Sequence, residues 1–224
     1  MPTPSIEDYL KTIYRLESEA DAPSVSTGAI ADAMDVAPAS ASNMIRRLAD
    51  LGFLMHEAYA GASLTEPGRA VALEVIRHHR LLELYLKEVM GFDWDAIHDE
   101  AERLEHHISE AFEDRIEEML GHPTRDPHGH PIPTRDGAID DLSPHVLADL
   151  DTDNRAVIDH VSDEDTDLLR LLEQRDLMPG THVRVVDTRP LEGLMVVAVD
   201  GKEQLIGHSV AEKVFVQPAL ADQS

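Results

Sequence analysis

The stretch "VSTGAIADAMDVAPASASNMIRRLADLG", residues 25–52, decides the fold of the N-terminal part of the chain. Its second half places apolar side chains at Ala41, Ile45, Leu48 and Leu51, which is the spacing of one buried helix face. Gly52 follows as a stop signal, and the short break "DVAP" (35–38) separates this helix from the one before it. The stretch therefore predicts two helices joined by a tight turn.

The sequence on either side extends this unit. An amphipathic helix is predicted before it, with apolar residues at Ile6, Tyr9, Leu10, Ile13, Tyr14 and Leu16. After it, "FLMHEAYAGASLT" (53–65) alternates around Gly61 like a small hairpin. Helix, helix, turn, helix and hairpin is the order of a winged helix-turn-helix, the DNA-binding domain we expect over residues 1–64.

In such a domain the second helix of the pair enters the major groove with its N-terminal residues. Ser40, Ser42 and Asn43 would face base edges and phosphates, Asn43 could read adenine, and Arg46 and Arg47 would contact phosphates. The same pattern also suits the polar face of an ordinary surface helix, so the spacing alone leaves both interpretations open. The predicted DNA-binding residues are Thr27, Ala37, Ala39, Ser40, Ser42, Asn43, Arg46 and Arg47.

Composition qualifies the DNA-binding hypothesis. A net charge of −25 would ordinarily argue against nucleic acid as a partner. The acids are spread along the whole chain, however, as in proteins from extreme halophiles, and in molar salt the Debye length falls to about 3 Å. No cysteine is present, which excludes zinc–thiolate sites. The N-terminus lacks the pattern of a signal peptide and no 18-residue apolar run follows, so we expect a cytoplasmic protein without membrane contact.

Residues 65–121 are predicted to contain two long helices. The first, "TEPGRAVALEVIRHHRLLELYLKEVMG" (65–91), begins with a threonine cap and ends at a glycine. The second, residues 93–120, carries an apolar stripe at Ile97, Ala101, Leu104, Ile108, Ala111 or Phe112, Ile116 and Met119. This stripe suits a dimer interface, although burial within one chain is equally compatible with the pattern.

Histidines and acids on these helices have the spacing of metal ligands. His79 and Glu83 lie one turn apart on the first helix, and His98, Glu102, Glu105 and His106 fall on one face if the second helix is continuous. Imidazole and carboxylate donors suit a first-row divalent metal. A solvent-exposed helix of an acidic protein is the alternative.

The remainder of the chain reads as a connector and a β domain. Residues 122–155 are rich in Pro, Gly and Asp. Their histidines, His122, His128 and His130, could bind a metal, but ordering a flexible loop costs entropy, so we leave them out of the predicted site. Valine-rich alternating runs from about 156 to 218 predict a small antiparallel barrel without a catalytic signature.

Five motifs in this order resemble the diphtheria-toxin-repressor family of iron- and manganese-dependent transcriptional repressors: "IEDYLKTIYRLE", "ASASNMIRRLADLGFL", "LTEPGRAVALEVIRHHRLLE", "IHDEAERLEHH" and "GHPIP". The resemblance implies a mainly α fold with a small β part. Its domains would be a winged helix-turn-helix (1–64), a helical metal-binding and dimerisation domain (65–140), a linker (141–155) and an SH3-like, FeoA-type barrel (156–224).

The resemblance also implies two metal sites. The first would take Asp8, Glu102, Glu105 and His106. The second would take His79, Glu83 and His98, completed by a group of the third domain, for which Asp165 is the nearest candidate. Carboxylates at positions 8 and 102 are typical of the manganese-type members, and hard oxygen donors suit Mn²⁺, so we favour Mn²⁺ over Fe²⁺.

The predicted function is that of a homodimeric, metal-dependent repressor that binds a double-stranded DNA operator and controls metal-ion homeostasis. An Fe²⁺-dependent repressor of iron-uptake genes is the main alternative. A dinuclear metallohydrolase could use the same ligands, but the sequence shows no substrate pocket, and we predict no enzymatic activity. A winged-helix sensor of an organic ligand and a peptide-binding role for the C-terminal barrel are further alternatives.

Overall fold

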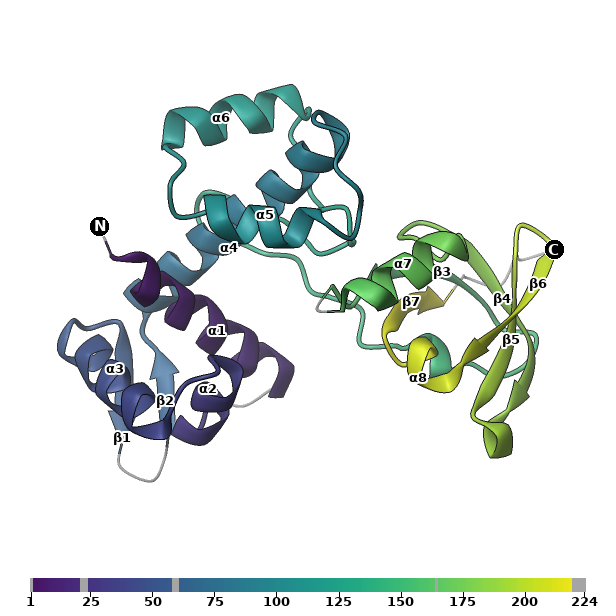
Figure 1. Cartoon of the computed structure of the whole chain (residues 1–224), viewed down its shortest axis with the longest axis horizontal. Coiled ribbons are helices and arrows are strands. Elements are labelled where there is room, and N and C mark those ends of the chain that lie inside the picture. The colour runs from purple at the N-terminus through teal and green to yellow at the C-terminus, as the bar shows by residue number, and fades with distance from the viewer. Residues whose placement is uncertain (1, 21–23, 58–60, 164, 219–224) are drawn as a thin grey trace. The chain divides into compact units, whose positions relative to one another are not determined.

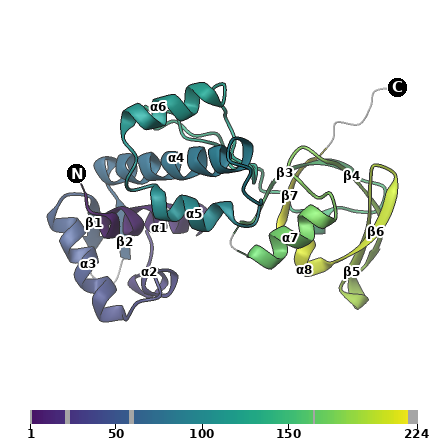
Figure 2. The same ribbon diagram turned by 45° about the horizontal axis from the view of Figure 1, so that its top comes forward.

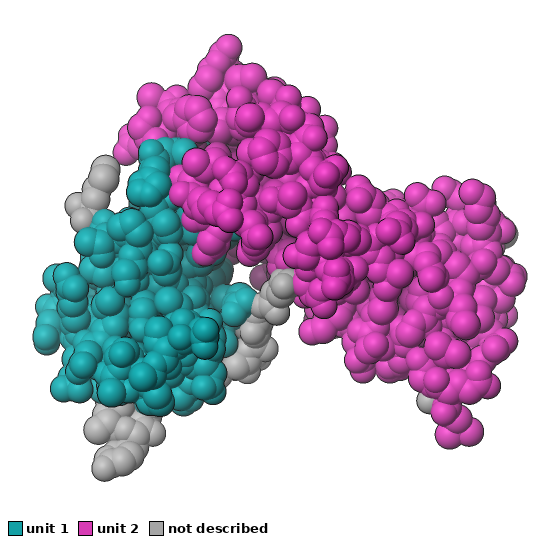
Figure 3. Space-filling model, viewed as in Figure 1, with its two compact units in different colours: residues 1–79, 105–108, 133–138 teal, residues 80–104, 109–132, 139–224 magenta. Residues whose placement is uncertain are grey.

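The structure is a computed structural model that describes residues 2–20, 24–57, 61–163 and 165–218. The chain divides into two compact units, coloured separately in Figure 3. Unit 1 comprises residues 1–79, 105–108 and 133–138, and unit 2 comprises residues 80–104, 109–132 and 139–224. Each unit is described by itself. Within the described residues, no helix is long and apolar enough to cross a membrane.

Unit 1 contains the predicted helix-turn-helix. Helices α1 (Pro4–Ala20), α2 (Thr27–Ala33) and α3 (Pro38–Asp50) follow in order (Figure 1). The side chain of Ser26 caps α2 by accepting a hydrogen bond from the Ala29 amide, and a proline opens α3, where its missing N–H costs nothing. The prediction of two helices separated by a short turn is confirmed.

The hairpin and the core of unit 1 also match the prediction. Strands β1 (Leu54–Glu57) and β2 (Gly61–Leu64) pair antiparallel, and the tip at residues 58–60 lies outside the described residues. The apolar face of α1 packs against the buried faces of α2 and α3 in one cluster; its members include Ile6, Leu10, Ile13, Ile30, Ile45 and Leu48. Because this core is continuous, the position of α1 fixes that of α3.

Helix α4 (Glu66–Glu88) is the first predicted long helix, and the hydroxyl of Thr65 accepts a hydrogen bond from the Gly68 amide as the predicted cap. The second predicted long helix is wrong. It is broken into α5 (Ile97–Leu104) and α6 (Glu110–Met119), seen as separate helices in Figure 1. Helix α5 ends at Leu104, and Ser109 begins the new helix, with an extended backbone and a hydroxyl that accepts a hydrogen bond from the Phe112 amide.

The C-terminal part of unit 2 is an antiparallel sheet of five strands in the order β6-β5-β4-β3-β7. The strands are β3 (Arg155–Val161), β4 (His182–Arg189), β5 (Leu194–Val199), β6 (Lys202–Gly207) and β7 (Val214–Pro218). Helices α7 (Thr166–Gln174) and α8 (His208–Ala211) belong to the same body (Figure 2), with the short 3-10 helices η1 (Leu147–Asp149) and η2 (Pro190–Glu192). The predicted antiparallel barrel is therefore corrected to an open antiparallel sheet, since β6 and β7 remain its two edges among the described strands.

Candidate metal centres and nucleic-acid interface

Unit 1 brings together Asp8, Glu105 and His106, which we call the first cluster. Asp8 lies on α1, whereas Glu105 and His106 occupy the turn that follows α5 in sequence. His106 Nε2 is 2.7 Å from Asp8 Oδ1 and 3.5 Å from Glu105 Oε1, and one donor atom from each residue lies within 4.8 Å of the others. The ligand atoms therefore meet because the helix has ended, and the continuous helix face predicted from the sequence is not what assembles them.

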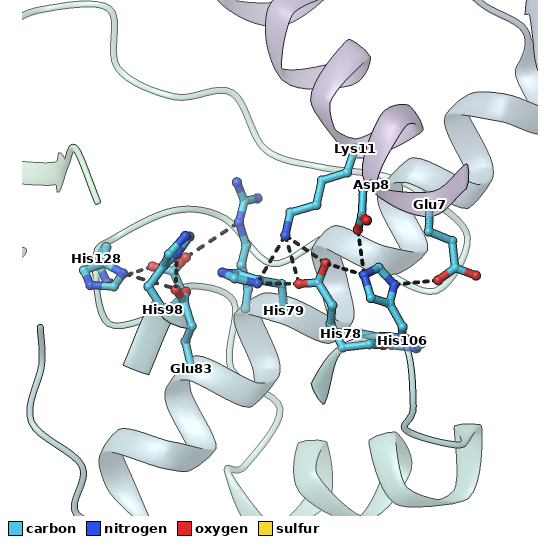
Figure 4. Close-up of polar contacts among 12 residues, drawn as sticks. Glu7, Asp8, Lys11, His78, His79, Glu83, His98, His106 and His128 are labelled. Atoms are coloured by element: carbon cyan, nitrogen blue, oxygen red, sulfur yellow. Dashed lines mark hydrogen bonds and ion pairs between the residues drawn. The ribbon is translucent and has the colours of Figure 1, made fainter. Parts of the chain in front are cut away.

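Glu7 orients the first cluster. Its carboxylate accepts a hydrogen bond from His106 Nδ1 at 2.6 Å (Figure 4). This bond fixes the imidazole so that Nε2 faces Asp8 and Glu105, an arrangement that metal-binding histidines commonly have with an outer carboxylate. The apolar spacing of α1 did not predict a role for Glu7. Its position directly before Asp8 is the feature of the sequence that could have indicated it.

Unit 2 brings together Glu83, His98, His128 and Asp163, which we call the second cluster. The Glu83 carboxylate is completely buried on α4, 3.2 Å from His98 Nδ1 and 3.7 Å from His128 Nδ1 (Figure 4). Donor atoms of Glu83, His128 and Asp163 all lie within 4.8 Å of one another. Asp163 sits between β3 and α7, so the cluster joins α4 and α5 to the connector and the C-terminal sheet.

An ordered turn at residues 126–130 presents His128. Asp126 Oδ1 accepts hydrogen bonds from the backbone amides of His128 and His130, at 2.8 and 2.9 Å. Trp94 donates to the Pro127 carbonyl at 3.1 Å, and its ring lies beside the His128 ring, with centroids 5.1 Å apart. Gly129 is held at φ +91°, with its Cα so near β3 that a Cβ would lie 2.2 Å from the Asp159 carbonyl oxygen. This part of the predicted flexible loop is thus a buried, well-bonded element.

The chemistry of the second cluster fits a cation. His128 is completely buried, yet neither of its ring nitrogens makes a hydrogen bond within the described part of the chain. Burial would lower the pKa of His128, but the adjoining Glu83 carboxylate, with Asp126 and Asp163, raises it to about 9. A site that attracts a proton so strongly and leaves imidazole nitrogens unbonded can also accept a divalent metal.

Three predicted ligands, His79, Glu102 and Asp165, are not members of the two clusters defined above. His79 lies in unit 1, where its Nδ1 is 2.5 Å from Glu105 Oε2. The implied second site of His79, Glu83 and His98 stays a prediction. Glu102 is exposed on α5 in unit 2, and its membership of the first site stays a prediction. Asp165 is exposed and caps α7 by accepting from the amides of Asp167 and Leu168, while Asp163 takes the position beside the histidines.

The structure also places the predicted DNA-binding residues. Thr27 and Ser42 are half-buried, and the others are exposed on or just before α3: Ala37, Ala39, Ser40, Asn43, Arg46 and Arg47. Arg46 bends back along the helix, with Nε donating to the Ser42 carbonyl at 3.2 Å and Nη2 to Asn43 Oδ1 at 3.1 Å. The polar face of α3 is therefore free of the protein core, as a recognition helix requires.

A helix-turn-helix with a hairpin, next in sequence to helices that carry imidazole and carboxylate clusters, defines the class of metal-dependent DNA-binding regulators. Three family domains match the chain: "Iron dependent repressor, N-terminal DNA binding domain" over residues 1–62, "Iron dependent repressor, metal binding and dimerisation domain" over 65–134, and "FeoA domain" over 145–218. The chain belongs to the diphtheria-toxin-repressor family of metal-dependent repressors.

Individual relatives agree with this assignment. The iron-dependent repressor IdeR of Mycobacterium tuberculosis is 34% identical over 225 residues, covering 94% of this chain and 96% of IdeR. The regulator MntR of Oceanobacillus iheyensis is 38% identical over 122 residues, 54% of this chain and 81% of MntR. A solved structure of a manganese-dependent transcriptional repressor in complex with manganese is 35% identical with a TM-score of 0.85, covering 95% of this chain and 99% of that one.

Proposed function

We propose that this chain is a Mn²⁺-dependent repressor that binds operator DNA as a homodimer. The observation that supports this most directly is the first cluster, in which Asp8 of the DNA-binding segment meets Glu105 and His106. Oxygen and imidazole donors without any sulfur ligand suit Mn²⁺, the weakest binder of the first-row series, which is selected by ligand type and geometry. Fe²⁺ accepts the same donors and is the alternative.

The first cluster would act on DNA binding through α1. Asp8 and the buried residues Ile6, Leu10 and Ile13 belong to the same helix, and that helix shares its core with α3. When bound, the metal supplies a double positive charge that holds Asp8 to the turn at 105–108. A change from 1% to 99% of the DNA-competent state would need about a 10⁴-fold preference of the metal for that state, or about 5.5 kcal/mol.

The second cluster would hold a further metal ion through Glu83, His128 and Asp163, with His98 beside them. All four residues come from different segments of unit 2, so the ion would stabilise the packing of the C-terminal sheet on the 126–130 turn. We propose Asp163, in place of Asp165, as the ligand from the C-terminal domain, because its carboxylate is the one that approaches the histidines.

A dimer is supported by apolar side chains that unit 2 leaves exposed. Phe112 and Met119 on α6 are 45% and 49% exposed, and Val89 and Met90 at the end of α4 are 47% and 56% exposed. Large apolar residues that gather on one helical unit typically form an interface. The family domain matched over residues 65–134 is described as a dimerisation domain. A repressor of this kind would act on DNA in the cytoplasm.

A DNA-binding titration tests the proposal. The whole protein is incubated in high salt with Mn²⁺, with Fe²⁺ under anaerobic conditions, with Zn²⁺ or with a chelator, and operator affinity is measured by fluorescence anisotropy. We expect tight binding with Mn²⁺ and its loss with the chelator. Chelator-insensitive binding would overturn the metal dependence, and tighter binding with Fe²⁺ than with Mn²⁺ would overturn the metal preference.

A further inference from the structure

Lys11 places its side-chain ammonium group inside the first cluster. Its Nζ donates to both oxygens of Glu105, each at 2.9 Å, and lies 3.3 Å from His79 Nδ1 (Figure 4). The Glu105 carboxylate is completely buried, and the Lys11 side chain is 20% exposed. An ammonium group that faces both oxygens of a carboxylate occupies the side from which a metal ion would also approach.

Glu105 needs such a cation in the metal-free protein. An ionised carboxylate without contact with water is costly unless a positive charge and hydrogen bonds compensate it. Lys11 supplies both, and its flexible four-carbon stem reaches Glu105 from α1, 94 residues away in sequence. A divalent ion placed a few ångströms from this ammonium would be repelled by it, while Glu105 would have fewer lone pairs left to offer.

We propose that Lys11 is the resident cation of Glu105 and competes with the metal for it, which sets the metal concentration at which the first cluster fills. This inference rests on the proposed function, in that Asp8, Glu105 and His106 hold the metal. Lys11 thus acts in two ways that oppose each other. It stabilises the metal-free protein by joining α1 to the turn at 105–108, and it weakens metal binding at the same place.

The two effects separate this role from a merely structural one. Lys11→Met keeps the length and apolar stem of the side chain but removes the charge. If Lys11 competes with the metal, the metal-free variant melts at a lower temperature than its parent, and its Mn²⁺ dissociation constant is lower by about tenfold. If Lys11 only supported the fold or held Glu105 in place, its replacement would lower both the stability and the metal affinity.

The parent protein of the experiment is the Glu83→Gln variant, which lacks the central carboxylate of the second cluster. Lys11→Met and Lys11→Arg are each introduced into this parent and compared with it. Lys11→Gln is a second uncharged variant in case the methionine is poorly tolerated. Lys202→Met, at an exposed position of strand β6, is the matched control for loss of a lysine charge. Free Mn²⁺ is measured by its electron paramagnetic resonance signal, and melting is followed with and without Mn²⁺.

We expect tighter Mn²⁺ binding by both uncharged variants, and affinities close to that of the parent for Lys11→Arg and Lys202→Met. Unchanged or weaker Mn²⁺ binding by Lys11→Met and Lys11→Gln would overturn the competition, even though the parent binds the metal. Failure of the parent itself to bind Mn²⁺ would overturn the proposed function of the first cluster. The two failures are therefore distinguishable.

Discussion

The two clusters use the same kinds of side chain in different surroundings. In the first cluster a lysine already balances the buried carboxylate, and Asp8 is 35% exposed. In the second cluster Glu83 and His128 are both completely buried, and the His128 nitrogens make no hydrogen bond to any described residue. On the proposed function, a metal ion would replace a proton of His128 in the second cluster, whereas in the first cluster it would compete with the ammonium group of Lys11. We therefore expect the second cluster to support the fold and the first to respond to the metal concentration.

The largest expected effect tests whether only the first cluster controls DNA binding. Asp8→Asn removes the carboxylate that α1 contributes, and we expect Mn²⁺-dependent operator affinity to fall by at least 100-fold, or about 3 kcal/mol. Circular dichroism should stay unchanged. The control is Asp200→Asn in the turn between β5 and β6, where φ is +49° and Asn is tolerated. If Asp8→Asn bound the operator with wild-type affinity, the control of DNA binding by the first cluster would be contradicted.

A slightly smaller effect is expected when the second cluster is disabled. Glu83→Gln keeps the shape of the side chain but removes the charge between His98 and His128. A ligand at 100 times its dissociation constant stabilises a protein by about 2.7 kcal/mol. We expect added Mn²⁺ to stabilise the wild type by about this much more than it stabilises the variant. Calorimetry of the melting transition measures it. The idea fails if Mn²⁺ stabilises the variant as much as the wild type.

The 126–130 turn offers a third test, because its shape presents His128. Gly129→Ala would force a Cβ against the Asp159 carbonyl, and we expect it to cost about 2–3 kcal/mol of stability and to weaken Mn²⁺ binding at the second cluster only. Gly180→Ala is the matched control in the same unit, with φ +85° and nothing within 4 Å of the new Cβ among the described atoms; we expect it to cost about 1 kcal/mol. Equal losses from both variants would show that the close approach to β3 is unimportant.

The smallest effect concerns protons. With a pKa of about 9, raised from 6.5, His128 is protonated in the metal-free protein at neutral pH and must lose that proton to bind a metal. We expect about one proton released per metal ion at pH 7–8, and Mn²⁺ affinity at the second cluster to fall about tenfold for each unit of decreasing pH below 9. Titration calorimetry in two buffers of different ionisation enthalpy measures the release. The Asp8→Asn variant disables the first cluster, so any proton release on adding Mn²⁺ comes from the second cluster. If this variant released no protons, the role of His128 would be contradicted.

The same raised pKa predicts how the metal-free protein responds to pH. Because the folded state binds the proton more tightly than the unfolded state, the stabilisation is fully present below pH 6.5 and is lost as the pH rises through about 9. Metal-free protein should therefore melt at a lower temperature at pH 9 than at pH 6.5. Added Mn²⁺ should reduce this difference.

Local patterns in the sequence predicted the helix-turn-helix, its hairpin and four members of the two clusters, Glu83, His98, Glu105 and His106, whereas Asp8 was implied by the family resemblance. Apolar spacing identified α1 and α3, because each buries one face, and the threonine cap and terminal glycine identified α4. The break before α6 was overlooked, although Ser109 was readable as a cap, because the apolar stripe continues through it in register. His128 and Asp163 could not be predicted as partners, because their meeting depends on contacts between the connector and β3 that are distant in sequence, such as Gly129 against Asp159.

The hydrogen bond from Arg46 to Asn43 affects how α3 would read a base pair. While the arginine occupies Oδ1, the asparagine amide can donate to a purine N7 but cannot fully accept from adenine N6, so adenine and guanine would look alike to it. Movement of Arg46 to a phosphate would free that oxygen. Contact with the DNA phosphate would then come first and base discrimination second. The protein would bind without distinguishing adenine from guanine at this position until Arg46 contacts a phosphate.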